Sequence, residues 1–259
     1  MSIEVDHDWW KTMFDEVYLV TDARSVCDEE LTRREVDVIC EFLPIQPGDR
    51  ILDLCGGHGR HSFELCTRGF ADCTLLDYSR SLTELAISEA DRRNYGIDII
   101  RSDARDTGLP SESFDHVIIM GNSLGYINEP AADFKIIEEA YRLLRNGGWL
   151  LVDVTDGAAV KKSLNPNAWH EIGDDVVVCR QRELVGNKIH AREMVLSKQQ
   201  GIIRDRTYAV RLYDSHTLAA LLSQTQLKGV GVHTDFSPHR SKGDYGCMNR
   251  RIIATGRKI

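Results

Sequence analysis

The chain has 259 residues, of which 42% are hydrophobic and 28% are charged, and its formal net charge is −8. This length can bury a full core, either as one large α/β domain or as a domain with an insertion. No apolar stretch approaches a membrane span, and the acidic residues 1–8 lack the pattern of a secretory signal. The negative charge argues against nucleic acid or an anionic membrane as a partner, because those contacts are built on Lys and Arg. We therefore expect a cytoplasmic protein.

The cysteines give no sign of a disulfide framework or a zinc site. Their number is odd and no pair has CxxC spacing, so we expect scattered reduced thiols and no metal. They are Cys27, Cys40, Cys55, Cys66, Cys73, Cys179 and Cys247.

Residues 1–45 are predicted to be helical and to form a lid segment. Trp9, Trp10 and Phe14 recur at helical spacing, and a second apolar pattern runs over residues 31–43. Pro44 and the Pro47-Gly48 pair then end it.

Residues 46–156 alternate short apolar runs with helical patterns, which predicts a doubly wound, mostly parallel sheet. Ser81 followed by Glu84 has the spacing of a capping box for the second helix of this region. The expected strands are residues 50–54, 72–77, 98–101, 116–120 and 149–154, and the expected helices are residues 61–68, 80–94 and 132–145.

The pattern changes after residue 156. Residues 176–184, 188–197 and 202–212 predict three longer strands, with turns at Gly186-Asn187 and Gly201. Residues 157–213 thus form an expected antiparallel insertion, which covers a substrate site or pairs with a second copy to make a homodimer. Residues 214–259 carry a helix and two strands that complete a seven-stranded core sheet.

Residues 51–61, Ile-Leu-Asp-Leu-Cys-Gly-Gly-His-Gly-Arg-His, read as a strand, a glycine loop and the start of a helix. Such a loop points free backbone N–H groups at a ligand, so we expect a nucleotide-type cofactor. A dinucleotide fingerprint needs a third glycine where Ser62 stands. A nicotinamide oxidoreductase is therefore the weaker interpretation.

Four elements occur in order at the ends of successive predicted strands. They are Asp53, the Cys55–Gly59 loop, Asp77, and the Asp103-Ala104 pair. Over about residues 45 to 155 this arrangement resembles the class I S-adenosylmethionine-dependent methyltransferase family, of the small-molecule type. The resemblance implies S-adenosylmethionine as the cofactor.

The resemblance also implies roles for individual residues in holding the methionine and ribose parts of the cofactor. The backbone of Cys55, Gly56, Gly57 and Gly59 would approach the methionine and ribose, and Asp53 would hold the loop or meet the methionine amino group. Cys55 stands where the family usually has its first glycine, and it fits if its φ is negative.

Further residues are implied around the adenine and the transferred methyl group. Asp77 would accept from the ribose hydroxyls, Tyr78 would lie against the adenine, and Asp103 with Ala104 would meet the adenine amino group. Met120, Gly121 and Asn122 would line the face where the methyl group moves. Tyr18 and Arg24 are expected near the cofactor.

Methyl transfer from a sulfonium is an in-line displacement in which the protein chiefly aligns the reactants and excludes water. No fixed catalytic residue is therefore required, and the candidates are Tyr126, His170 and Tyr18. We expect an O, N or S nucleophile of a small metabolite as the methyl acceptor. The alternatives are a non-catalytic cofactor-binding module and a nucleic-acid methyltransferase, but the segment after the fourth strand lacks the Pro-Pro-aromatic sequence of the latter.

Overall fold

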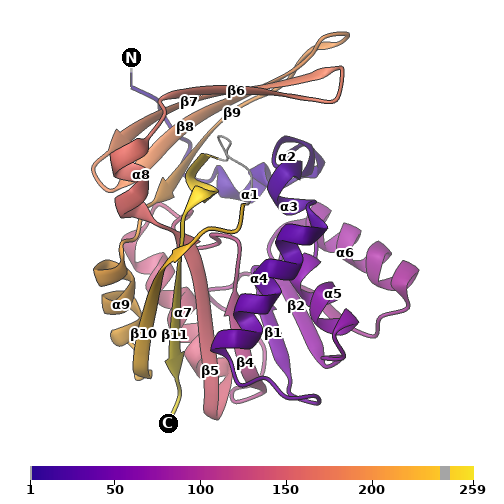
Figure 1. The fold of residues 1–259 in the computed structure, drawn as a ribbon, viewed down its shortest axis with the longest axis vertical. Helices are drawn as coiled ribbons and strands as arrows, with labels where there is room; N and C mark the ends of the chain where they lie inside the picture. The colour runs from indigo at the N-terminus through magenta and orange to yellow at the C-terminus, as the bar shows by residue number, and fades with distance from the viewer. Residues whose placement is uncertain (1, 240–245) are drawn as a thin grey trace.

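The computed structural model describes residues 2–239 and 246–259, except for the side chains of Ala23 and Arg24. A central sheet is flanked by helices, and a second sheet lies beyond one end of it, with short helices between the two (Figure 1). In this part of the chain, no helix is long and apolar enough to cross a membrane.

The central sheet has seven strands in the order β10-β11-β5-β4-β1-β2-β3. Its parallel strands are β1 (Ile51–Leu54), β2 (Cys73–Asp77), β3 (Asp98–Arg101), β4 (Phe114–Ile119) and β5 (Leu144–Thr155). β11 (Arg251–Arg257) runs antiparallel between β5 and β10 (Lys228–Phe236). β1 and β4 are buried along their whole length, as expected for strands covered on both faces. The predicted fold is confirmed.

Helices cover both faces of this sheet. α4 (Glu29–Phe42), α5 (Arg60–Thr67) and α6 (Arg80–Arg93) pack on one face, and α7 (Pro130–Leu143) and α9 (Ser215–Ser223) on the other. The predicted capping box at Ser81 is wrong, because the N-cap of α6 is Ser79, two residues earlier, whose side chain accepts the backbone N–H of Leu82. The Gly147-Gly148 pair lies inside β5 and does not separate a helix from a strand.

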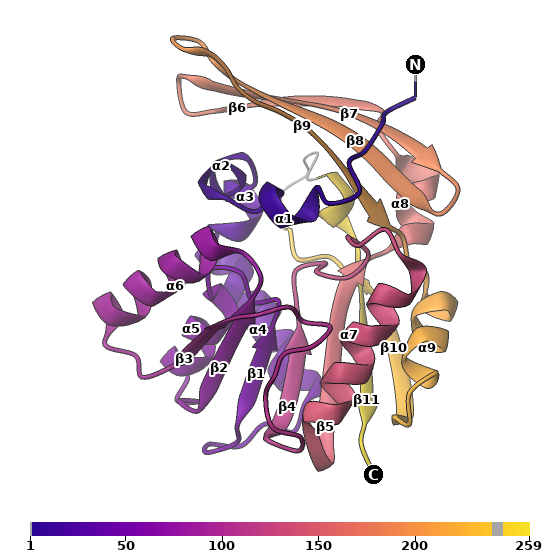
Figure 2. The same cartoon turned by 180° about the vertical axis from the view of Figure 1, so that it is seen from behind.

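The N-terminal segment is broken into short helices and is not one continuous helical region. α1 (Trp10–Met13), α2 (Glu16–Thr21) and α3 (Ala23–Val26) precede α4, and Asp15 caps α2 by accepting the N–H of Tyr18. Figure 2 shows these helices between the carboxyl ends of the parallel strands and the second sheet. This placement brings the aromatic side chains of α1 to the edge where the glycine loop lies.

The second sheet is antiparallel, with the order β6-β7-β8-β9, and α8 (Gly157–Ser163) connects it to β5. Its strands are β6 (Asn167–Ile172), β7 (Val176–Val185), β8 (Lys188–Ser197) and β9 (Gly201–Arg211). β6 was not predicted, and the catalytic candidate His170 lies within this strand. The reason is that β6 is an edge strand with Trp169 exposed, so its sequence lacks apolar alternation. A short 3₁₀-helix (Gly246–Asn249) precedes β11.

Candidate functional site

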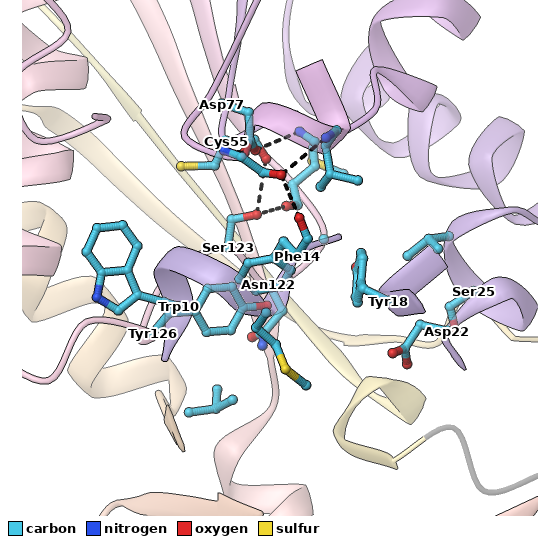
Figure 3. Close-up of a pocket in the computed structure, with 18 of the residues that line it drawn as sticks. Trp10, Phe14, Tyr18, Asp22, Ser25, Cys55, Asp77, Asn122, Ser123 and Tyr126 are labelled. Carbon is cyan, nitrogen blue, oxygen red and sulfur yellow. Dashed lines mark hydrogen bonds between the residues drawn. The ribbon is translucent and has the colours of Figure 1, made fainter. Parts of the chain in front are cut away.

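A pocket of about 1830 Å³, its open mouth included, lies at the carboxyl ends of the parallel strands. Its floor is formed by the loops after β1 to β4, and its walls by α1–α3 and one face of the second sheet. Figure 3 shows Cys55, Asp77 and Ser123 from the floor on one side, and Tyr18 and Asp22 on the other. Ligands of open α/β sheets bind at this end of the strands.

Most residues singled out from the sequence line this one pocket. Asp53, Gly59 and His170 are not part of its lining, and the side chain of Arg24 lies outside the described residues. The lining includes Tyr18, Cys55, Gly56, Gly57, Asp77, Tyr78, Asp103, Ala104, Met120, Gly121, Asn122 and Tyr126.

The glycine loop departs from expectation at Cys55, whose φ is +63° and not negative. A left-handed conformation at a non-glycine residue costs about 1 kcal/mol. The loop is held by neighbouring strands: the N–H of Gly56 donates to the carbonyl of Leu76, and the carbonyl of Cys55 accepts from Ser123 Oγ. Burial raises the pKa of the Cys55 thiol, so this side chain is not a reactive thiolate.

Asp53 and Gly59 support the loop from below. Ser62 Oγ donates to Asp53 Oδ2 over 2.8 Å, and burial raises the pKa of the carboxyl group to about 6. A Cβ on Gly56 would stand 2.7 Å from the Asp53 carboxylate, and one on Gly59 would stand 2.9 Å from Leu75. Both glycines are therefore required by close packing beneath the pocket.

Asp77 fixes the loop to the end of β2. Its Oδ2 accepts the N–H of Gly57 and its Oδ1 accepts the N–H of Ser79, each over 2.8 Å. Burial nevertheless raises the pKa of this carboxyl group. Next to it, the Tyr78 ring lies 4.8 Å from that of Trp10, measured between centroids.

Asp103 lines the pocket and forms an ion pair with Arg105. The Nε and Nη2 groups of Arg105 donate to the two carboxylate oxygens over 2.9 and 2.5 Å. Although partial burial acts in the opposite direction, these bonds hold the pKa of Asp103 below its usual value.

The segment after β4 is fixed from beneath by buried polar groups. The N–H of Gly121 donates to Asp153 Oδ2 over 3.1 Å, and Asn122 Oδ1 accepts the N–H of Thr155 over 2.8 Å. Further along, the N–H of Gly125 donates to the buried Asp133. The floor of the pocket at this point is a pre-organised surface and not a loose loop.

An aromatic cluster, Trp9, Phe14, Tyr18, Tyr126 and Tyr208, lies between the floor and the second sheet. Phe14 is central, with its ring 5.1 Å from that of Tyr18 and 5.2 Å from that of Tyr126. Burial raises the pKa of the Tyr18, Tyr126 and Tyr208 hydroxyls, that of Tyr208 to about 12. These hydroxyls are therefore protonated near neutral pH and act as hydrogen-bond donors, not as bases.

The second sheet contributes charged side chains to the pocket that the sequence did not single out. Arg180 Nη2 donates to Asp22 of the N-terminal segment over 2.9 Å, and Arg180 Nε donates to Glu193 over 2.8 Å. Arg182 also lines this wall. The alternation of charged with β-branched residues in β7 was visible, but only the fold shows which face turns inward.

A second group of buried charges joins α4, α5, β5 and β11. Glu35 is fully buried and accepts from Arg60, from His61 Nε2 over 3.0 Å, and from Arg251 Nη1 over 3.3 Å. Arg251 also pairs with Asp153. This network could not be predicted from the sequence, because its members are far apart in the chain.

A family model described as "Methyltransferase domain" matches residues 51–148, which run from β1 into β5 and hold most of the pocket floor. The chain contains a class I S-adenosylmethionine-dependent methyltransferase domain. S-adenosylmethionine is the cofactor of this family.

Curated relatives resemble the methyltransferase domain over part of their length. A ubiquinone/menaquinone biosynthesis C-methyltransferase of Rhizobium etli is 33% identical over 111 residues, covering 41% of this chain and 42% of the relative. A demethylmenaquinone methyltransferase of Renibacterium salmoninarum is 32% identical over 152 residues, covering 58% of this chain and 60% of the relative. The chain thus spans between two fifths and three fifths of these relatives.

Solved structures share the fold over nearly the whole chain. The CcbJ methyltransferase of Streptomyces caelestis has a TM-score of 0.76 at 19% identity, covering 98% of this chain and 99% of that one. A methyltransferase of Clostridium acetobutylicum has a TM-score of 0.74 at 16% identity, covering 93% and 96%. At these identities the likeness concerns the fold, which includes the second sheet as well as the methyltransferase domain.

Proposed function

We propose that this protein transfers the methyl group of S-adenosylmethionine to an O, N or S nucleophile of a small metabolite. One observation carries the proposal: residues from the ends of four parallel strands converge on a pocket that continues beneath the second sheet. The pocket therefore has a half that suits the cofactor and a half that suits an acceptor.

In the cofactor half, the residues follow the order of the strands. Asp103 and Ala104 after β3 suit the adenine amino group, with the Tyr78 and Trp10 rings beside it. Asp77 after β2 has carboxylate oxygens for the ribose hydroxyls, and the Cys55–Gly57 backbone after β1 suits the methionine part. Asp53 and Gly59 shape this half without lining it.

In the acceptor half, the aromatic cluster and the charged wall of the second sheet enclose the reacting groups. Aromatic faces attract cations, which favours a sulfonium or an amine between them. When bound, the cofactor supplies an already activated methyl group, so the chain's own task is alignment and exclusion of water. Tyr18 and Tyr126 can orient an acceptor by donating hydrogen bonds.

The names of similar proteins support a small-molecule acceptor. They include a glycine/sarcosine N-methyltransferase from Aphanothece halophytica and a sugar N-methyltransferase from Streptoalloteichus. These names describe those proteins, and they differ in the atom that receives the methyl group. We further propose that residues 1–45 act as a lid and that residues 157–213 cover the acceptor.

A thermal-shift experiment followed by a transfer assay tests the proposal. S-adenosylhomocysteine at 100 times its dissociation constant should stabilise the protein by about 2.7 kcal/mol, whereas NAD should give no shift. A screen of metabolite extracts with a labelled methyl donor should then give a methylated product. Binding without transfer would favour the non-catalytic module, and a shift with NAD alone would contradict both.

A further inference from the structure

The order of the strands fixes the direction in which a cofactor lies in this pocket. In the sheet, the strands lie side by side in the order β3, β2, β1, β4. The pocket floor therefore runs from Asp103 past Asp77 to the glycine loop and Gly121. With the adenine at the β3 end, the amino-acid end lies between the glycine loop and Gly121. This end must hold a carboxylate and an ammonium group.

A carboxylate needs a cation there, because the acidic side chains of Asp53 in β1 and Asp77 at the end of β2 lie beside the glycine loop. Arg60 directly follows Gly59, opens α5 and lines the pocket. Its Nη2 lies 3.8 Å from the point where a Cβ would stand on Gly121. The guanidinium is therefore beside the amino-acid end of the floor.

One edge of the Arg60 guanidinium is already fixed. Nη1 donates to Thr32 Oγ1 over 3.0 Å and to the fully buried Glu35. Within the described residues, Nε and Nη2 have no hydrogen-bond partner, and neither atom is fully buried. Arginine presents its donors in a rigid fork that matches a carboxylate, and here the fork is held in place by its other edge.

The other arginine of this network is not available for the same task. Arg251 is 1% exposed, and its donors are directed to Asp153 and Glu35. Glu35 in turn is shared between Arg60, His61 and Arg251, so it neutralises Arg60 only in part.

We propose that Arg60 binds the α-carboxylate of the cofactor through its free Nε and Nη2 edge. This inference rests on the proposed function. It gives Arg60, the first residue of α5, a role in cofactor recognition. From the sequence, Arg24 was the arginine expected near the cofactor.

The test compares two ligands that differ only in the carboxylate: S-adenosylhomocysteine and its decarboxylated form, S-adenosyl-3-thiopropylamine. Calorimetry gives the ratio of their dissociation constants for each variant. The wild-type chain should bind S-adenosylhomocysteine roughly 10- to 100-fold more tightly, as expected for a charge-assisted pair. Arg60→Gln should bring the ratio close to 1, while Arg68→Gln, at the C-cap of α5 and outside the pocket, should leave it unchanged.

Arg60→Gln leaves Glu35 with one cation fewer, which can impair folding. The double variant Glu35→Gln/Arg60→Gln removes both charges, and its ratio of the two dissociation constants should also fall close to 1. A wild-type ratio in either variant, or a collapse caused by Arg24→Gln in their place, overturns the inference. If the wild-type chain binds the two ligands equally, the inference fails and the proposed function stands; if it binds neither, the proposed function itself fails.

Discussion

At the scale of single residues, the pocket is built from carboxylates that already serve the backbone. Asp77 accepts two N–H groups of the loops on either side of β2, so it is fixed before any ligand arrives. A carboxylate held in this way binds hydroxyl groups without losing side-chain entropy. The position of the Asp77 carboxylate is set by these backbone hydrogen bonds and does not depend on a ligand.

Replacing Asp77 by Asn should weaken S-adenosylhomocysteine binding by roughly 10- to 100-fold, because an amide accepts from the ribose hydroxyls with one oxygen and no charge. Calorimetry measures the change. Asp72→Asn, an exposed residue just before the same strand, serves as the control. Equal binding by wild type and Asp77→Asn would contradict the ribose assignment.

Two histidines, His58 in the glycine loop and His61 in the first turn of α5, predict that the stability of the protein depends on pH. Burial, and then the positive charge of Arg60, lower the pKa of both His58 and His61 from 6.5 to about 4. Between these values the unfolded chain binds more protons than the folded one, so the free energy of unfolding falls as the pH falls from 6.5 toward 4. Each histidine accounts for a loss on the order of 3 kcal/mol.

Urea unfolding at a series of pH values measures this slope. His58→Gln should flatten it in the window between the two pKa values, whereas His216→Gln, at an exposed site, should not. A free energy of unfolding that rises on acidification through this window would show that these histidines are not buried in their neutral form.

At the scale of elements, ion pairs join the N-terminal helices to the second sheet. Arg180 pairs with Asp22 at the end of α2, and Arg204 pairs with Asp15 at its beginning. Glu193 lies between the two arginines and accepts from both over 2.8 Å. The two walls of the pocket are thus connected over the acceptor half.

Breaking one of these pairs should loosen the wall. Asp22→Asn leaves Arg180 with Glu193 alone, so backbone hydrogen exchange in α2 should accelerate and KM for the acceptor should rise several-fold. Asp205→Asn breaks the pair with Arg192, which is half exposed, and provides a matched control. Unchanged exchange in α2 would show that packing of the aromatic cluster alone holds this helix.

At the scale of the whole molecule, the second sheet leaves one apolar surface exposed. Trp169 is 70% exposed and Ile202 is 65% exposed, on the two edge strands. From the sequence, this sheet either covers the substrate site or pairs with a second copy, and large exposed apolar side chains are typical of the second arrangement. This expectation remains a prediction.

Light scattering during gel filtration tests it. The wild-type chain should have the mass of two copies, and Trp169→Glu should shift it to one without changing cofactor binding. Leu85→Glu, on an exposed face of α6, is the control. A wild-type chain with the mass of one copy would contradict the prediction.

The parallel core and the residues that line the pocket floor could be predicted from the sequence alone. Strand ends, a glycine loop and the acidic residues that follow successive strands are local features, and parallel strands bring them to one edge whatever surrounds them. The condition under which Cys55 was expected to fit, a negative φ, is not met, because hydrogen bonds to residues distant in the chain hold the loop in its conformation.

Which buried charged residues form ion pairs depends on the tertiary structure. Glu35 and Arg251 are 216 positions apart and bond to each other, and Arg180 reaches Asp22 across 158 positions. A charged residue in a sequence is most often solvated, and its burial becomes favourable only when the fold supplies a partner at bonding distance. The glycine loop and Arg60 are therefore visible in one short segment, whereas the orientation of the Arg60 guanidinium depends on Thr32 and Glu35 of α4, far away in the chain.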